Sequence, residues 1–443
     1  MTGTPPAVDS PTRSSPHRSA AWVLRKLARS GRDLITFQTD SYPEILINDP
    51  DHARHVLALR KDNYTKETPP NEQFRRHLAD GILTSEGERW RRERAVLQPA
   101  FRQSERVRAT ARELTERLCD RLAGAARTGE PVDLSRTMSD LTIAITGHAL
   151  FDLDLGAAAE LIGTATNEVF DSAPGMLAAP DRPRVRQSRD EVLRMIDSGI
   201  QDRTASSSSS SSCPFSGKGG EDLLSVLIQD EDHSGDALLQ QVLTVLLAGY
   251  ETTANALTWV WILTARHPEA RRDWEAALAG SDGAGERHTL AVFRETLRLY
   301  PPAWVIGRRA IEDDQIGKHR IPAGAVITIS PFALHRHPKY WSRPDEFDPS
   351  RFLPGGERPR NRYAYIPFGA GPRYCIGAPY ADAEAAEILP PIARRFRFEL
   401  ITEVPEQPES RFVLRAPAPL WVRVEERTGS TNGPRVAQPS DEH

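Results

Sequence analysis

Cysteine is scarce in this chain of 443 residues, which contains three: Cys119, Cys213 and Cys375. They are too widely spaced for a disulfide framework or a zinc site, because both need closely grouped cysteines. Disulfides are rare in reducing compartments, so this pattern favours a cytoplasmic location. Cys119 lies in a helix-like pattern and Cys213 in a serine-rich tract, and neither surrounding suggests a chemical role.

A strong excess of basic charge is also absent, since the 57 Lys and Arg residues face 61 Asp and Glu, for a net charge of -4. Nucleic-acid-binding domains carry strongly basic surfaces, so we expect no nucleic-acid partner. We expect no membrane anchor, because the most apolar stretch, 238–263, includes Gln240, Gln241 and Glu251, which a bilayer would penalise. Residues 1–19 lack the apolar core of a signal peptide.

The hydrophobic periodicity predicts a mostly helical fold with a small β portion. Helices are expected at about 50–60, 86–98, 104–127, 134–150, 155–172, 185–202, 221–230, 236–266, 268–279 and 286–299. Strands are expected at Leu34–Gln38, Glu44–Asn48, Phe396–Glu399, within 303–330 and within 412–424. We expect one domain over 20–427, a flexible Ser/Gly loop at about 204–220, and disordered tails at 1–19 and 428–443.

The most informative segment is FGAGPRYCIG, residues 368–377, which places Cys375 among three glycines and beside an arginine. Glycines permit tight turns and close approach of the backbone to a flat ligand. Ala378–Leu389 are rich in helix formers, so Cys375 should precede a helix N-terminus, where amide donors and the helix dipole stabilise a thiolate. Pro390 and Pro391 predict that this helix ends early. A thiolate held in this way is suited to bind a metal centre.

The helix predicted over 236–266 carries a second unusual segment, AGYETT, at residues 248–253. Ser234 is the predicted N-cap of this helix. Gly249 costs about 1 kcal/mol relative to alanine in a helix interior. A buried carboxylate such as that of Glu251 is costly unless it is paired or functional. The alternative is a structural helix with a satisfied acid and threonines that bond back to the preceding turn.

Together the two segments resemble the haem-binding loop and the oxygen-activating helix of the cytochrome P450 family, and the resemblance extends over about residues 34–424. It implies the cytochrome P450 fold, with haem b between a central long helix and the helix that follows the cysteine loop. The implied activity is that of a monooxygenase, which inserts one oxygen atom of O2 into a hydrophobic small molecule and releases the other as water.

The resemblance assigns roles to the residues of both segments. Cys375 would be the proximal iron ligand, whose sulfur donates the electron density that favours O–O cleavage. Ala248 and Gly249 would make room for dioxygen, Thr252 would donate a hydrogen bond to it, and Glu251 would deliver protons through water.

A further set of residues would hold the haem. These are Trp90, Arg94, Arg308, His335, Phe368, Gly369, Arg373 and Gly377. Trp90 and Arg94 lie one helical turn apart, which places an indole donor and a guanidinium on one face toward a haem propionate. The alternative is a solvated basic helix with one packed tryptophan. Arg308 competes with its neighbour Arg309 for the same role, and His335 is nearly as plausible as a structural residue.

Glu295 and Arg298 lie three residues apart, hence on one helix face. With Arg351 they resemble the structural triad that the family places behind its haem loop. The family often has glutamate at the position of Ser350, a departure that leaves Arg351 in place.

The position of several apolar segments implies a substrate pocket. Its residues would be Ile82, Leu83, Val245, Ala248, Ala303, Trp304, Val305 and Ile306, together with the 173–179 loop. These side chains suggest a hydrophobic guest such as a terpenoid, a fatty acid or a polyketide-like molecule.

Only 68 residues follow Cys375, too few for a flavin or iron–sulfur domain, so we expect electrons from an external ferredoxin or flavodoxin with an NAD(P)H reductase. Arg89, Arg91 and Arg92 are a candidate docking face for such an acidic partner. A monomer is expected. A peroxide-driven peroxygenase, oxidative coupling or desaturation on the same haem, and a non-catalytic haem sensor are the alternatives.

Overall fold

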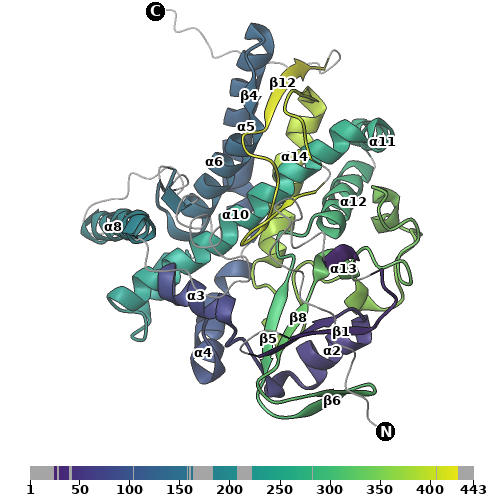
Figure 1. The fold of residues 1–443 in the computed structure, drawn as a ribbon. Coiled ribbons are helices and arrows are strands. Elements are labelled where there is room, and N and C mark those ends of the chain that lie inside the picture. The colour runs from purple at the N-terminus through teal and green to yellow at the C-terminus, as the bar shows by residue number, and fades with distance from the viewer. Residues whose placement is uncertain are drawn as a thin grey trace, which may run out of the picture.

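The computed structural model describes residues 24–26, 29–38, 42–102, 104–156, 158, 161–162, 183–206, 222–281, 283–405 and 407–427. Within these residues the fold is mostly helical with small β-sheets, which confirms the predicted class (Figure 1). Some expectations fall outside the described residues: most of the 155–172 helix, the 173–179 loop, most of the Ser/Gly loop, Cys213 and both tails.

The long helix α10, Asp236–Arg266, runs diagonally through the middle of the molecule in Figure 1. Its first cap residue is Gly235, which has a φ of 55° and no side-chain cap bond, so the prediction of Ser234 as N-cap is wrong. Helix α6, Leu134–Thr146, packs along α10. A Cβ on Gly249 would lie 3.3 Å from Cγ2 of Thr146, so this glycine permits the close approach of the two helices.

The other helices surround α10, and most match the expected ranges within a few residues. They are α2 (Pro50–Arg54), α3 (Pro69–His77), α4 (Gly87–Leu97), α5 (Ser104–Thr128), α8 (Pro183–Ser206), α9 (Leu223–Gln229), α11 (Pro268–Ala279), α12 (Ala284–Leu299), α13 (Pro331–Leu334) and α14 (Ala378–Arg395). Two π-helical turns, His55–Leu59 and Gly147–Phe151, extend α2 and α6. Helix α3 was not predicted, because Phe74 is its only buried apolar side chain.

Helix α14 corrects another expectation, since it continues through Pro390 and Pro391 to Arg395. The two prolines lack the amide hydrogens that would bond back to the preceding turn. Packing keeps the segment helical, because Ile388, Leu389, Pro390 and Ile392 are buried and α14 packs against α5 and α12. Tertiary burial therefore outweighs the local cost of the prolines.

The strands form small sheets beside the helices. The largest has the order β1 (Leu34–Gln38), β2 (Pro43–Ile47), β8 (Val326–Ile329), β5 (Ile306–Ala310) and β3 (Tyr64–Thr65). A second contains β4 (Val132–Asp133), β12 (Trp421–Glu426) and β9 (Phe396–Leu400), and two hairpins pair β6 (Asp314–Ile316) with β7 (His319–Ile321) and β10 (Glu409–Ser410) with β11 (Leu414–Arg415). In the part of the chain that the structure describes, no helix is long and apolar enough to cross a membrane.

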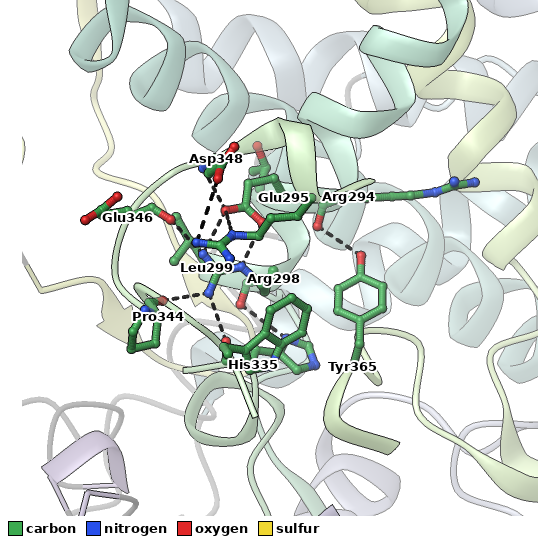
Figure 2. Close-up of polar contacts among 12 residues, drawn as sticks. Arg294, Glu295, Arg298, Leu299, His335, Pro344, Glu346, Asp348 and Tyr365 are labelled. Carbon is green, nitrogen blue, oxygen red and sulfur yellow. Dashed lines mark hydrogen bonds and ion pairs between the residues drawn. The ribbon is translucent and has the colours of Figure 1, made fainter. Parts of the chain in front are cut away.

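A buried ion pair on α12 organises the segment that leads to the cysteine loop (Figure 2). Nε and Nη2 of Arg298 each donate to one carboxylate oxygen of Glu295 at 2.7 Å, and both side chains are 0% exposed. The same guanidinium donates to the backbone carbonyls of His335, Pro344 and Glu346 at 2.6 to 2.9 Å. The pair thereby joins α12 to residues 335–346.

Arg351 completes this group, as the resemblance implied. Its Nε lies 3.5 Å from Oε1 of Glu295, and its Nη2 donates to the carbonyl of Arg343 at 3.1 Å. The backbone amide of Asp348 donates to the same Glu295 oxygen at 2.8 Å. Ser350 stands where the family often has glutamate. Its hydroxyl donates to Asp348, and the contacts of Arg351 are made without an acidic side chain at position 350.

His335 has a structural role, which corrects its prediction as a haem-binding residue. It is fully buried, its Nε2 accepts from the backbone amide of Ile366 at 2.8 Å, and its Nδ1 lies 3.2 Å from the carbonyl of Arg298. Burial, followed by repulsion from Arg298, lowers its pKa to about 3, so the ring is neutral. With both ring nitrogens occupied, His335 ties α12 to the segment just before the cysteine loop.

We predict that Arg298→Leu destabilises the protein by about 3–5 kcal/mol, because the buried Glu295 carboxylate loses its main partner. Arg294→Leu is the matched control on the same helix, since Arg294 is 37% exposed and its Nη2 lies 3.4 Å from Oδ2 of Asp382. It should cost less than about 1 kcal/mol. Denaturant unfolding of both variants measures the difference, and equal losses would contradict the role of the buried pair.

Candidate active site

The cysteine loop is held in place by its glycines. Gly369 and Gly371 have φ values of 71° and 72°, which glycine adopts at no steric cost. A Cβ on Gly371 would lie 1.9 Å from the carbonyl oxygen of Leu57, so a larger residue would clash with the π-helical turn after α2. The amide of Cys375 donates to the carbonyl of Phe368 at 2.9 Å, which closes the loop.

Cys375 lies just before α14, as predicted, with Gly377 as the N-cap residue. The backbone amides of Gly377 and Ala378 and the guanidinium of Arg94 all favour the thiolate. Desolvation opposes them and is the larger effect, so the pKa of the Cys375 thiol is raised. The thiol is nevertheless accessible by surface area, which suits a ligand that must be reached by another group.

Trp90 and Arg94 on α4 meet Arg373 of the cysteine loop. The guanidinium carbon of Arg373 lies 4.0 Å from the centre of the Trp90 ring, and Nη1 of Arg94 donates to the carbonyl of Tyr374 at 2.9 Å. Nη2 of Arg373 lies 3.0 Å from Oε1 of Glu86. The helix and the loop, which are far apart in the sequence, therefore place two cations side by side.

Two further cations come from the sheet. Strand β3 pairs with β5 and brings Lys66 near Arg308 and Arg373. Burial and repulsion from Arg373 lower the pKa of Arg308 to about 10. Burial and repulsion from both arginines lower the pKa of Lys66 to about 7. The amide of Lys66 donates to Glu86 at 2.9 Å and its ammonium to the carbonyl of Leu83.

The sequence did not identify Lys66 as a site residue, because no motif surrounds it. Only the pairing of two short strands, β3 and β5, brings it to the cationic cluster. The same pairing separates Arg308 from Arg309. Arg309 donates from Nε to the carbonyl of Glu67 at 2.7 Å and its guanidinium carbon lies 5.7 Å from the centre of the Tyr42 ring. Arg308, which is 7% exposed, is therefore the arginine that faces the cationic cluster.

Glu251 on α10 is buried and paired with an arginine that the sequence did not suggest. Nη2 and Nε of Arg415, on β11, lie 2.5 and 3.2 Å from its Oε1, while its Oε2 has no hydrogen-bond partner in the described chain. The side-chain oxygen of Asn255 accepts from the backbone amide of Ala416 at 3.1 Å and reinforces this contact. Arg415 also lines a surface pocket of about 360 Å³ that includes Trp259.

One turn of α10 is less buried than its neighbours. Ala248, Gly249 and Thr252 are half-buried, whereas the residues around them along the helix are mostly buried. The hydroxyl of Thr252 donates to the carbonyl of Ala248 at 2.8 Å, the back-bond that a purely structural threonine would also make. Its oxygen lone pairs remain available to a donor on that open face.

The predicted pocket residues are spread over three hydrophobic clusters and one exposed position. Gln241 fixes the 80–83 turn against α10, because its Oε1 accepts from the amide of Ile82 at 3.2 Å. Ile82 and Leu83 pack against the main hydrophobic cluster, which contains Val245. Trp304 lies in a separate cluster with Phe332 and Leu414, and its indole donates to the carbonyl of Arg411 at 2.9 Å. Ala303 is exposed, Val305 packs on the Trp304 cluster, and Ile306 packs on a third cluster around the sheet.

The proposed docking arginines on α4 each have an acidic partner, which weakens that expectation. Arg89 pairs with Asp80 and Glu93, Arg91 with Glu88, and Arg92 with Asp232, at 2.8 to 3.2 Å. Their charges are largely compensated, so this face of α4 is not strongly basic.

Comparison with known proteins gives a consistent result. The cytochrome P450 family matches residues 14–423. Cyclooctatin synthase of Streptomyces melanosporofaciens is 34% identical over 410 residues, 87% of each chain, and cyclooctat-9-en-7-ol 5-monooxygenase of the same organism is 30% identical over 74% of each. The crystal structure of CYP175A1 from Thermus thermophilus superposes with a TM-score of 0.72 at 29% identity and covers 91% of this chain and 94% of that one. The chain therefore belongs to the cytochrome P450 family and is a P450 monooxygenase.

Proposed function

We propose that this monooxygenase inserts one oxygen atom from O2 into an apolar small molecule, with Cys375 as the thiolate ligand of haem b. The observation that carries the proposal is the position of Cys375, directly before the N-terminus of α14 and beside the guanidinium of Arg94. When bound, the haem would supply the oxygen-activating chemistry. The residues of this chain would bind the haem, orient the substrate and supply protons.

The cationic cluster fits the two propionates of a haem. Arg308, Arg373 and Lys66 share one carboxylate, that of Glu86, and Nη1 of Arg373 is buried without a partner in the described residues. Such an excess of positive charge at partly buried positions is costly, and a dianionic group would relieve it. Arg94 and the indole of Trp90 lie at the same place and would complete the contact.

Glu251 and Thr252 would manage protons on the α10 side. Arg415 holds Glu251 as an ion pair, and the surface pocket beside Arg415 would let water approach the pair. Release of Glu251 from Arg415 would turn its carboxylate toward the open face at Thr252. The threonine hydroxyl would then hold the proton-carrying water or dioxygen by a hydrogen bond.

A terpenoid-like guest is the substrate class best supported. Ile82 and Leu83 of the 80–83 turn pack against the apolar cluster that contains Val245, which favours an apolar guest. The two Streptomyces relatives are named for cyclooctatin and for cyclooctat-9-en-7-ol, whose name is that of a cyclic alcohol. We therefore expect a largely apolar, cyclic molecule with few polar groups.

Electrons would come from an external ferredoxin or flavodoxin with its reductase. Tyr374 of the cysteine loop is 45% exposed and Leu59, on the turn that packs against that loop, is 60% exposed. The side chains of Arg358, Arg360 and Arg362 are exposed, and none has a carboxylate partner among the described residues. Arg362 begins a short helical turn, Arg362–Ala364, that packs against α2. An apolar centre with basic neighbours suits an acidic protein.

Lys66→Met should accelerate haem loss about 10- to 100-fold, because it removes a charge-assisted contact worth about 1.5–3 kcal/mol. Transfer of haem to an excess of a haem-scavenging apoprotein measures the rate. Arg92→Met is the control, since Arg92 is 60% exposed and pairs with Asp232. Equal rates for the two variants would show that Lys66 does not hold the cofactor.

The carbon monoxide difference spectrum of the reduced protein tests the thiolate ligand. The wild type should give the strongly red-shifted Soret band of a thiolate-bound haem. Cys375→Ser should lose this band, whereas Cys119→Ser should keep it, because Cys119 is buried in α5 and burial raises its pKa to about 11. A wild-type band at the position of histidine-ligated haem would refute the proposal.

Turnover with NADPH, a surrogate ferredoxin and its reductase tests the remaining parts. With terpenoid alcohols the wild type should form oxygenated product, and omission of the ferredoxin should stop it. Thr252→Ala should lower product per NADPH roughly tenfold or more while NADPH is still consumed. Thr258→Ala, on the same helix and with the same 2.8 Å back-bond, should behave as the wild type. Undiminished product from Thr252→Ala would exclude its role.

A further inference from the structure

The surface pocket beside Arg415 is larger than access for water requires. Its volume is about 360 Å³, which lies within the range of small-molecule sites, whereas one water molecule needs only about 10–15 Å³. Residues of the loop after β9 and of the chain between β11 and β12 form its walls, together with Trp259 of α10 and Trp421 of β12. The pocket can therefore hold an organic molecule, and the mechanism above gives it none.

Proline and tryptophan give this pocket rigid, apolar walls. Trp421 is 43% exposed, and its backbone is fixed on both sides. Its amide donates to the hydroxyl of Thr402 at 2.7 Å, and its carbonyl accepts from the amides of Ile401 and Thr402 at 2.9 and 3.1 Å. Because proline fixes its own φ angle, proline-rich walls lose little conformational freedom when a ligand binds. The prolines in the lining are Pro405, Pro408, Pro417 and Pro419.

The charges around the pocket favour a cation. Glu403 lines the pocket, is exposed, and has no ion-pair partner among the described residues. Glu409 also lines it, and its Oε2 lies 2.9 Å from Nε of Arg411. Arg415 is the one basic residue in the described lining, and its guanidinium is already bound to Glu251. The pocket and its partners thus carry three carboxylates against two guanidiniums, which leaves a negative charge for a ligand to compensate.

A tryptophan ring beside an unpaired carboxylate is a suitable site for an organic ammonium group, because the face of the ring attracts a cation. Glu403 follows Thr402, to which the Trp421 amide is bound, so the carboxylate and the ring lie at one side of the pocket. We propose that the pocket is an effector site for a small organic cation with an apolar body. The cationic group binds between Trp421 and Glu403, and the apolar body packs on the prolines.

Arg415 connects this pocket to the acid of α10. It lines the pocket and holds Oε1 of Glu251. A cation bound in the pocket repels the guanidinium and weakens this ion pair, so Glu251 is released more readily. Trp421 and Glu403 are exposed, whereas the Arg415 side chain is 17% exposed, so the cation binds at the mouth and water still reaches the pair. The effector role rests on the function proposed above, in which Glu251 leaves Arg415 to deliver protons.

Ligand-observed NMR of the haem-loaded protein tests the site without turnover. The probe is phenyltrimethylammonium, which has no nitrogen lone pair and so cannot bind the haem iron. The substrate site is blocked with 4-phenylimidazole. Saturable transfer of magnetisation to the N-methyl protons is expected, with an affinity that falls as salt is added. Phenylacetate, of similar size and opposite charge, should bind more weakly. No saturable transfer, or equal binding of phenylacetate, would overturn the proposal.

Variants of the pocket locate the probe. Trp421→Ala should weaken its binding about 2- to 30-fold, through loss of the cation–π contact. Glu403→Gln should weaken it about 1.5- to 5-fold, as expected for an exposed ion pair. Ile401→Ala is the control for Trp421, because Ile401 is 48% exposed and does not line the pocket. Glu399→Gln is the control for Glu403, because Glu399 is exposed and pairs with Arg423. Equal binding by all four variants would place the probe elsewhere and refute the site.

The effector role has its own readout in the turnover assay. Saturating phenyltrimethylammonium should raise product per NADPH of the wild type about two- to fivefold, because a nearby unit charge weakens the hold of Arg415 on Glu251. Trp421→Ala should show the basal yield of the wild type and little response to the probe. If the probe binds and the yield does not change, the pocket is not an effector site. If the wild type gives no product while the NMR results hold, the failure lies with the proposed function and the cation site stands.

Discussion

The buried pair of Glu295 and Arg298 is the interaction on which the site depends. Two charges are removed from water, and they are tolerated because the guanidinium also satisfies three backbone carbonyls from the segment after α13. His335 extends the connection to Ile366, two residues before the cysteine loop begins. A chain of buried hydrogen bonds therefore runs from α12 to the loop that carries Cys375, so the position of the sulfur is set by a network rather than by the loop alone.

The sequence was most informative where the functional residues are close together in the chain. The cysteine loop, the AGYETT segment of α10 and the Glu295–Arg298 pair each consist of neighbouring residues, and the structure places them in the expected helices and loop. Two predicted helix ends were wrong because they rested on local sequence signals alone. Ser234 is a good cap residue, but Gly235 occupies the cap position, and the two prolines of α14 are kept helical by burial.

Residues that act through long-range pairing could not be predicted. Lys66 reaches the cationic cluster only because β3 pairs with β5, and Arg415 reaches Glu251 only because the C-terminal hairpin lies on α10. The charged residues of the site are thus brought together only by the tertiary structure, whereas the predicted iron ligand Cys375 is recognisable from its sequence motif.

The pairing of β3 with β5 also bears on how such a chain can be recombined. Lys66 and Arg308 lie far apart in the sequence but share one electrostatic environment with Arg373 and Glu86. Consider a chimera with a relative whose crossover point lies between β3 and β5 in the sequence. Each motif would stay intact, but Lys66 would come from one parent and Arg308 from the other, so charges that were matched to one another would be separated. Crossover points that take β3, β5 and the cysteine loop from the same parent would preserve that match.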